Sequence, residues 1–193
     1  MRRWVVRAEG PPAPGSSVLA APGLSAGPDL PGSVGGLGWS WDLRADGRPE
    51  LPASADAIAL LPVRAGFVPL TGPRIKRTLL LTVRAGTPAD VLAEFESDLI
   101  AMPEHIGTIR SWALSRVDPV GGDTAWTHAW EQEYATIEGL TGEYLLNPYH
   151  WAHVDRWFDG EIPGAIVEPV LAHVFRWSRS PVLTDDLPGV GPD

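Results

Sequence analysis

The stretch Tyr144-Leu145-Leu146-Asn147-Pro148-Tyr149-His150 predicts a junction between two short helices. Proline has no backbone N–H and pushes the residue before it out of the helical region, so the first helix must end before Pro148. Asn147 is a suitable N-cap for the helix that follows, and Pro148 is a suitable first residue. His150 then falls in the first turn, where the positive end of the helix disfavours a charged imidazole.

Two interpretations of this junction are open from the residues alone. In the first, Tyr144 and His150 only pack together at a structural helix break. In the second, a neutral histidine beside a phenol forms a pair that is suited to removing a proton next to a carbonyl group.

The sequence around the junction predicts a regular order of strands and helices. Strands are expected over Ile75–Arg84, Thr108–Val117, Ala125–Tyr134 and Leu171–Trp177. A helix with Thr87 as N-cap is expected between the first two strands, and Pro103 is expected to end its apolar stripe. Two short helices precede the last strand. This order is typical of an α+β domain.

On this order of elements, Thr127-His128 and the string Tyr144-x-x-Asn147-Pro148-x-His150 resemble the Dabb family, the stress-responsive dimeric α+β barrels, and especially its plant polyketide cyclases. The resemblance implies a dimeric α+β barrel (ferredoxin-like) domain in which Tyr144 and His150 are the catalytic pair. The chain departs from the family in two places. Arg77 stands on the first strand where the family often carries a histidine, and the spacing from Tyr134 to Tyr144 is one residue longer.

The activity implied by the resemblance is a cofactor-independent, aldol-type cyclisation of a linear poly-β-keto or related acyl intermediate in small-molecule biosynthesis. His150 would be the general base, and Tyr144 would donate a hydrogen bond to the carbonyl oxygen where enolate charge develops. The 1,3-dicarbonyl groups of such a substrate acidify the proton, so no cofactor is expected. The alternative function is a non-catalytic barrel that binds a hydrophobic ligand or acts in a stress response.

Aromatic and histidine side chains supply the predicted wall of a substrate pocket. Trp126, His128 and Trp130 share one face of the third strand, which could equally be packed core. Trp151 and His153 follow in the helix after Asn147. We predict that these five side chains contact a small hydrophobic or polyketide-like substrate.

Other polar side chains are weaker candidates. His150 and His153 could reach a metal together with His128 or Asp155, but no acidic cluster supports a metal site, and none is predicted. His173 is expected to be a core histidine. Glu131 and Glu133 share the strand face opposite His128, and we expect a solvated or inter-sheet polar face there.

The chain divides near Gly72-Pro73. Residues 1–73 are rich in glycine and proline, and their apolar runs predict strands over Trp4–Ala8, Leu37–Leu43 and Ala57–Val63 without helices. The segment Ser40-Trp41-Asp42-Leu43 echoes Ser111-Trp112-Ala113-Leu114, which indicates either an internal repeat or a chance match.

We therefore predict a β-rich, degenerate barrel half over residues 1–73, a Dabb-like domain over 74–181 and a flexible acidic tail over 182–193. A single four-stranded sheet cannot bury both of its faces. A pseudo-dimeric monomer, in which the first half covers the second, is favoured over a homodimer.

Composition excludes several other classes of protein. The 193 residues are 44% hydrophobic, which is enough for a core, and contain no cysteine for disulfides or thiolate chemistry. A net charge of −9 argues against nucleic acid and anionic membranes as partners. No apolar run is long enough for a transmembrane helix, and the start of the chain does not predict a signal peptide, so a cytoplasmic location is expected. Lys76 is the only lysine, and the bias towards arginine, alanine, glycine and proline is typical of a high-GC bacterial gene.

Overall fold

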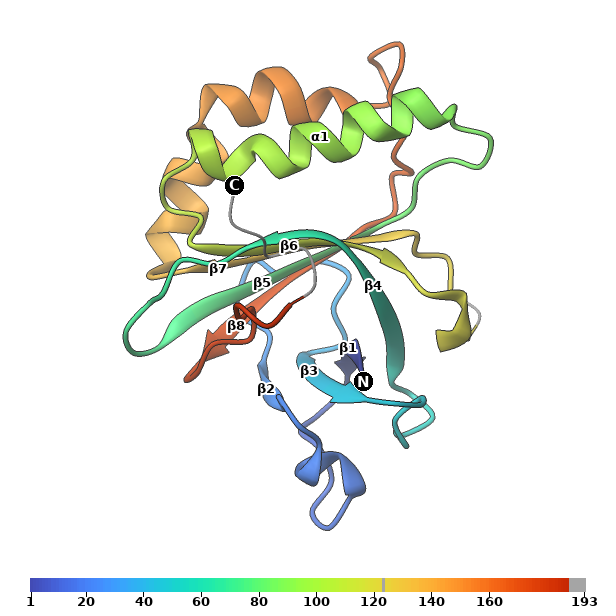
Figure 1. The fold of residues 1–193 in the computed structure, drawn as a ribbon, viewed down its shortest axis with the longest axis vertical. Helices are drawn as coiled ribbons and strands as arrows, with labels where there is room; N and C mark the ends of the chain where they lie inside the picture. Colours follow the sequence, from blue (N-terminus) through green and yellow to red (C-terminus); the bar gives the residue numbers. More distant parts are fainter. Residues whose placement is uncertain (123, 188–193) are drawn as a thin grey trace.

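The structure is a computed structural model that describes residues 1–122 and 124–187. Within these residues, strands join into one antiparallel sheet with the order β2-β3-β1-β4-β6-β7-β5-β8 (Figure 1). The strands are β1 (Arg2–Ala8), β2 (Ser25–Pro28), β3 (Trp39–Ala45), β4 (Asp56–Gly66), β5 (Arg74–Leu81), β6 (Ser111–Val117), β7 (His128–Tyr134) and β8 (Ala172–Ser178). The helical elements are α1 (Ala89–His105), the 3₁₀ turns η1 (Ser17–Ala20), η2 (Pro119–Gly121) and η5 (Asp155–Trp157), and the π-helical η3 (Gly139–Tyr144) and η4 (His150–Val154).

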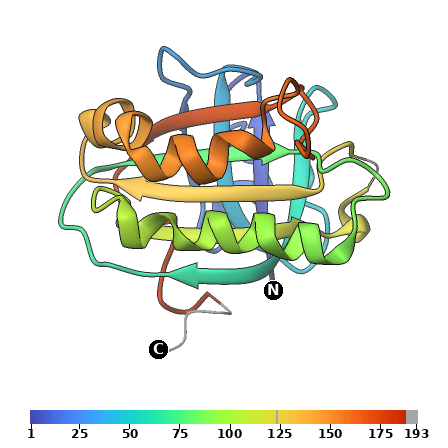
Figure 2. The same ribbon diagram turned by 90° about the horizontal axis from the view of Figure 1, so that it is seen from above.

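The C-terminal half is a ferredoxin-like layer of strands with helices on one face. Its chain order is β5, α1, β6, β7, η3 to η5 and β8, and its strands lie in the order β6-β7-β5-β8. Seen from above, α1 and the helical segments before β8 lie side by side over these strands (Figure 2). Alternate residues of β5, including Ile75 and Leu79, pack against Phe95 and Leu99 of α1, because successive side chains of a strand point to opposite faces.

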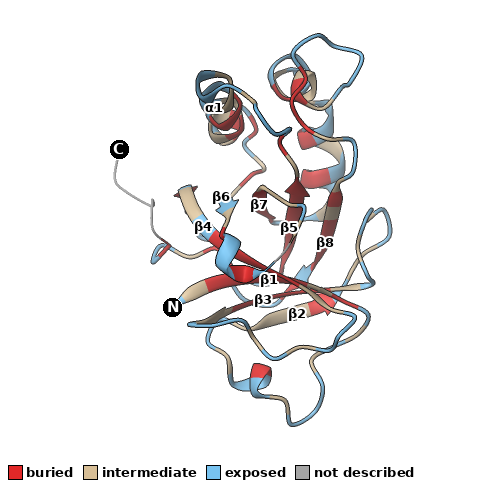
Figure 3. Ribbon diagram, turned by 90° about the vertical axis from the view of Figure 1, so that its right-hand side faces the viewer, coloured by how far each residue is buried: buried red, intermediate tan, exposed pale blue. Residues whose placement is uncertain are grey.

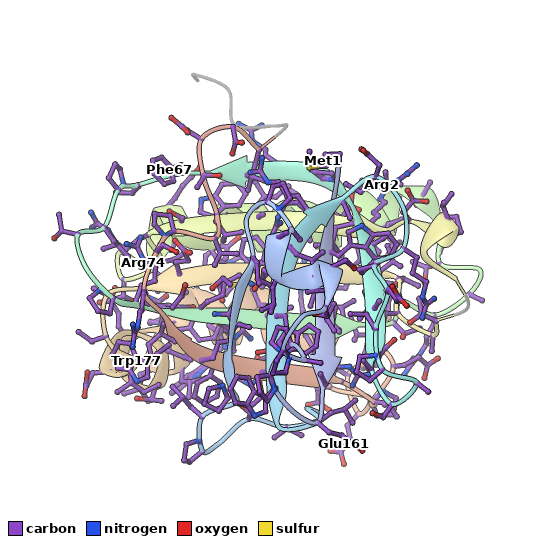
Figure 4. All side chains as sticks on the ribbon, turned by 90° about the horizontal axis from the view of Figure 1, so that it is seen from below. Met1, Arg2, Phe67, Arg74, Glu161 and Trp177 are labelled. Atoms are coloured by element: carbon purple, nitrogen blue, oxygen red, sulfur yellow. The ribbon has the colours of Figure 1, made fainter. Side chains whose placement is uncertain are left out.

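The N-terminal half repeats this strand order without the helices. Its strands lie in the order β2-β3-β1-β4, which matches β6-β7-β5-β8 element by element. They cover the face opposite the helices (Figure 1) and cross the direction of β5 and β8 when seen from below (Figure 4). Val5 and Ile58 from this half meet Leu80, Ala129 and Ala172 from the other half in a shared core.

The sheet is nearly closed into a barrel. On one side the two halves join through the β4–β6 ladder. On the other side β2 approaches β8, where Arg176 donates to the Ser25 carbonyl oxygen (3.0 Å) and the Ser25 and Ser178 hydroxyls are 2.9 Å apart. The α+β barrel fold predicted from the sequence is confirmed.

The strand order relates the two halves differently from the short sequence match on which the internal repeat was predicted. Val5 lies opposite Asp42 in the β1–β3 ladder, as Thr78 lies opposite Glu131 in the β5–β7 ladder. Strand order therefore relates β3 to β7, whereas the Ser-Trp-x-Leu echo relates β3 to β6. The four-residue match therefore joins two strands that do not occupy equivalent places in the two halves, as expected of a match that arose by chance.

Charged residues at corresponding positions meet inside the barrel. Arg3 contacts Glu131 (2.7 Å) and Asp42 (3.4 Å), and Lys76 contacts the same carboxylates at 2.9 and 3.5 Å. All four residues are buried. The strands of the sheet are coloured as buried along much of their length (Figure 3). When Arg3 is aligned with Lys76, because both contact the same two carboxylates, the β1–β3 and β5–β7 ladders align Asp42 with Glu131. Each half thus supplies one cation and one anion. Burial opposes ionisation of Glu131, but the cations outweigh it and lower its pKa to about 2.

Several element boundaries differ from those expected. Helix α1 begins at Ala89 with Pro88 rather than Thr87 as N-cap, and it continues through Pro103 to His105, held by the packing of Met102 and Ile106 in the core. Strand β2 was not predicted, because its sequence Ser-Ala-Gly-Pro has little strand propensity and depends on pairing with β3.

The segment that follows β8 also differs from the flexible tail expected from Val182. Val182, Leu183 and Leu187 are buried, and the backbone N–H groups of Val182 and Leu183 donate to Glu133 Oε1 (2.7 and 3.3 Å). The buried Glu133 carboxylate gives residues 182–187 a fixed anchor, which composition does not reveal. The rest of the predicted tail lies outside the described residues.

Candidate functional site

The helix junction follows the sequence prediction at Asn147. Residues on both sides are helical, Asn147 itself is not, and its Oδ1 accepts a hydrogen bond from Tyr149 N–H (2.9 Å) as an N-cap does. Its Nδ2 also donates to the His105 carbonyl oxygen (3.0 Å), which ties the junction to the end of α1. The turns that carry Tyr144 and His150 are π-helical. A π-turn accommodates one extra residue within a helix, in keeping with the longer spacing from Tyr134.

Tyr144 and His150 line one cavity of about 240 Å³ between the helices and the sheet. Their ring centroids are 4.7 Å apart with the planes inclined at 65°. Trp130 of β7 lines the same cavity, as do the apolar side chains Leu79, Leu99, Leu145, Val154, Phe158 and Leu171. The arrangement is an apolar chamber with a phenol and an imidazole on one wall.

Burial holds both rings in their neutral forms. Burial lowers the pKa of His150, with Arg77 acting in the same direction and Asp155 against it. His150 Nδ1 lies 3.2 Å from Asp155 Oδ1, an ion-pair distance whose geometry falls short of a hydrogen bond. Burial raises the pKa of Tyr144, although Arg77 opposes the shift. At neutral pH the site therefore offers an uncharged base and an intact phenol donor.

Arg77 and His173 complete the polar wall, and neither was in the predicted site. Arg77 Nε donates to His173 Nε2 (2.6 Å), its Nη1 donates to Gln132 Oε1, and its Cζ lies 4.7 Å from the Tyr144 ring centroid. Burial, Arg77 and His150 lower the pKa of His173 to about 3, so this imidazole is a neutral acceptor. The sequence signalled Arg77 only as a departure from the family, and gave no sign of His173 because strand register brings it beside Arg77.

The N-terminal half has no second copy of this wall. By the ladder register, Arg77 corresponds to Trp4, Gln132 to Leu43 and His173 to Ala57. Trp4, Leu43 and Ala57 belong to a separate apolar cluster that is covered by the loop containing η1. In the described barrel, the polar wall of Arg77, Gln132 and His173 therefore occurs in the C-terminal half, and apolar residues take its place in the N-terminal half.

Of the five predicted pocket residues, Trp130 lines the cavity with Tyr144, and the structure does not bring the other four there. Trp126 and His128 line a different cavity of about 470 Å³ beside β6 and the start of α1. His128 Nδ1 lies 2.8 Å from Thr127 Oγ1 and its Nε2 lies 3.2 Å from Glu96 Oε1, so both ring nitrogens are engaged. Burial lowers the pKa of His128, with Glu96 opposing.

Trp151 and His153 lie outside both cavities. Trp151 is 58% exposed and its Nε1 donates to the Leu145 carbonyl oxygen (2.7 Å). His153 stacks on Tyr149 with ring centroids 4.5 Å apart. Helical periodicity alone could not assign these side chains to the cavity or to the surface, because the π-turns change their direction.

Two further features concern the part of the chain that the structure describes. No group of three or more histidine, aspartate or glutamate side chains there is arranged to hold a metal ion. No helix within the same residues has the length and apolar character needed to cross a membrane.

Two of the matching solved structures share the fold across both halves. A proposed monooxygenase from Lactobacillus acidophilus NCFM has a TM-score of 0.53 at 8% identity and covers 90% of this chain and 92% of its own. A major regulator of staphylococcal pathogenesis has a TM-score of 0.50 at 10% identity, covering 93% and 98%. A dimeric, ferredoxin-like protein of unknown function from Bacteroides fragilis NCTC 9343 covers 53% of this chain and 94% of its own, with 22% identity and a TM-score of 0.41.

The sequence itself matches one family. No curated protein matches the chain. Residues 75–167 match Dabb, the stress responsive A/B barrel domain. This range contains β5 from its second residue, β6, β7 and both helices of the Tyr144–His150 junction. Residues 75–167, just under half of the chain, are therefore similar to the Dabb stress responsive A/B barrel domain.

Proposed function

We propose that the Tyr144–His150 cavity catalyses cofactor-independent ring closure of a poly-β-keto or related acyl substrate. The observation that carries this proposal is the neutral imidazole of His150 beside the phenol of Tyr144 in one apolar cavity. A base that is uncharged at neutral pH can accept a proton flanked by two carbonyl groups.

The mechanism divides the work between the two rings. Asp155 beside Nδ1 favours the tautomer with its proton on that nitrogen, which leaves His150 Nε2 to take the proton from substrate carbon. The Tyr144 hydroxyl donates to the carbonyl oxygen that becomes the enolate. The enolate carbon then attacks a second carbonyl of the same chain, and the proton held by His150 is returned to the new alkoxide. The apolar walls keep the chain folded and exclude water.

The cavity volume limits how much of the substrate is enclosed. Pockets for drug-sized ligands measure about 300–1,000 Å³, and this one is smaller at about 240 Å³. Leu145 and Asp155 line it and are partly exposed, so the remainder of a longer chain would extend past them to solvent.

The alternative function is binding of a hydrophobic ligand without turnover. The same cavity serves it, and Trp130 on the cavity wall provides a fluorescence signal. Quenching by β-keto compounds that are recovered unchanged would favour this alternative over the cyclase.

The test is turnover of linear tri- and tetra-β-keto acids and their thioesters, followed by mass spectrometry of the cyclised products. His150→Ala should lower kcat about 10³-fold because it removes the base. Tyr144→Phe should lower kcat about 10²-fold because it removes one donor to the enolate. His105→Ala is the matched control, since His105 is exposed and lies outside the cavity lining. Equal rates in wild type, His150→Ala and Tyr144→Phe would remove this pair from the mechanism.

A further inference from the structure

Arg77 differs from the other buried cations in having no carboxylate partner among the described residues. Its side chain is only 4% exposed. The cations inside the barrel contact carboxylates at 2.6 to 2.9 Å, namely Arg3 and Lys76 with Glu131 and Arg176 with Asp42, and Arg74 lies 3.8 Å from Glu133. A buried charge without a counter-ion costs several kcal/mol, so its retention needs another reason.

The protein contacts of Arg77 are all with uncharged groups. Its Nε and Nη1 donate to a neutral imidazole, His173, and to the Gln132 amide oxygen, which also accepts from Tyr134 Oη (2.8 Å). A guanidinium has five N–H donors in a planar fork. The Tyr144 hydroxyl also accepts a hydrogen bond from Arg77. The remaining guanidinium N–H groups belong to a side chain that lines the cavity.

The rest of the cavity is suited to a small apolar body. Leu79, Leu99, Trp130 and Phe158 form apolar walls, and the volume of about 240 Å³ accommodates a single ring or a short chain. Asp155 is the carboxylate in the lining. It is half-exposed and placed beside His150 rather than within ion-pair distance of Arg77.

We propose that Arg77 is the receptor for a carboxylate on the ligand, so that the site takes a small aromatic or keto acid in its ionised form rather than a neutral ester or amide. The ligand's carboxylate accepts N–H bonds from the guanidinium and supplies a counter-ion that none of the described residues provides. The lowered pKa values of His150 and His173 leave Arg77 as the positive charge on this wall at neutral pH. This inference deepens the proposed function, on which it rests for the location of the substrate.

The test compares ligands that differ only in charge. Calorimetric titration of the full chain with 3-phenylpropionate and with 3-phenylpropionamide should give binding of the acid at least about tenfold tighter, which corresponds to about 1.4 kcal/mol. Arg77→Met should abolish this preference and keep weak binding of both probes. Arg77→Lys should retain part of it, because lysine keeps the charge and loses the fork. The acid should raise the melting temperature of wild type and leave that of Arg77→Met unchanged.

Arg84→Met is the matched control, because Arg84 lines the other cavity and should not affect the preference. A preference that survives in Arg77→Met, is lost in Arg84→Met, or is absent from wild type up to millimolar acid would overturn the proposal. The two proposals fail separately. If His150→Ala and Tyr144→Phe turn over normally while Arg77→Met loses acid selectivity, the cyclase mechanism is wrong and the receptor stands. If instead His150→Ala and Tyr144→Phe lose turnover while Arg77→Met keeps its preference for the acid, the carboxylate receptor is wrong and the cyclase mechanism stands.

Discussion

At the scale of single residues, the cavity depends on keeping one phenol and two imidazoles uncharged beside a fixed cation, Arg77. The Tyr144–His150 pair could be predicted from sequence, because a helix break and a short spacing are local properties. The importance of Arg77 could not be predicted, because it depends on which side chains surround Arg77 in the folded chain, and none of those described is a carboxylate within ion-pair distance. His173 was expected to be core, and its contact with Arg77 depends on the register of β8 against β5.

His173 makes a testable contribution to the pH dependence of stability. Its folded pKa is lowered to about 3, whereas an unfolded histidine titrates near 6.5. Below about pH 6.5 the unfolded chain therefore binds a proton that the folded chain does not, and stability is lost as the pH falls towards 3. His173→Asn keeps an acceptor for Arg77 and removes this titration. Between pH 6 and 4, the free energy of unfolding measured in urea should fall more steeply with pH for wild type than for His173→Asn, by up to about 1.4 kcal/mol per pH unit. If the free energies of unfolding of the two proteins changed with pH in parallel, the lowered pKa of His173 would be wrong.

At the scale of elements, the sequence predicted which segments form strands better than where they begin. Each predicted strand of the C-terminal half overlaps an observed one, because the apolar runs at Ile75 and Leu171 are inherent in the sequence. The helical connection before β8 was less predictable. Its π-turns redirect Trp151 and His153, and a pattern counted at 3.6 residues per turn does not include that change.

Asn147 should hold the two helices of the site in place. Asn147→Ala removes both the cap on Tyr149 N–H and the bond to the His105 carbonyl oxygen, and should lower the free energy of unfolding by about 1 kcal/mol. Hydrogen exchange at the Tyr149 amide should accelerate. Asn147→Asp is the control, since it keeps the capping oxygen and should lose less. Unchanged exchange in the alanine variant would show that the cap does not stabilise the junction.

At the scale of the whole molecule, the two halves are held together by the buried charges. Arg3 of β1 reaches Glu131 of β7, and Arg176 of β8 reaches Asp42 of β3. Composition predicted that residues 1–73 lack helices, and their strands do lie opposite the helices of the other half. The charged interior was only partly anticipated. The alternation of side chains along a strand predicted that Glu131 and Glu133 share one face. Their cationic partners, Arg3, Arg74 and Lys76, lie on strands distant in sequence and could not be predicted in this way.

Glu131→Gln should be among the most destabilising substitutions at a charged position. It leaves Arg3 and Lys76 to share Asp42, so the free energy of unfolding should fall by about 3–5 kcal/mol. Because the folded pKa of Glu131 is lowered to about 2, the wild-type advantage should be fully present above about pH 4.5 and should be lost progressively as the pH falls from 4.5 towards 2. Chemical unfolding at pH 7 and pH 3 measures both effects. Glu161→Gln, at an exposed position, serves as the control, and an equally small effect of the two substitutions would contradict the role of the charged interior.

We expect the full chain to be a monomer in solution. The N-terminal strands already cover the face of the C-terminal strands that would otherwise need a second copy (Figure 1). Light scattering should give a mass near 20.7 kDa that does not change with concentration. A stable mass of twice this value would favour a homodimer with residues 1–73 as an appended module.

The four buried charges also bear on how this barrel can change by mutation. In a barrel made of two identical subunits, every substitution occurs twice and must be tolerated at both places. In a single chain with corresponding positions, Arg3 and Lys76 or Asp42 and Glu131 can differ from one another. The same independence allows Trp4 to stand where the other half carries Arg77. One half can then specialise in holding the barrel together, while the other retains the residues that we propose contact the ligand.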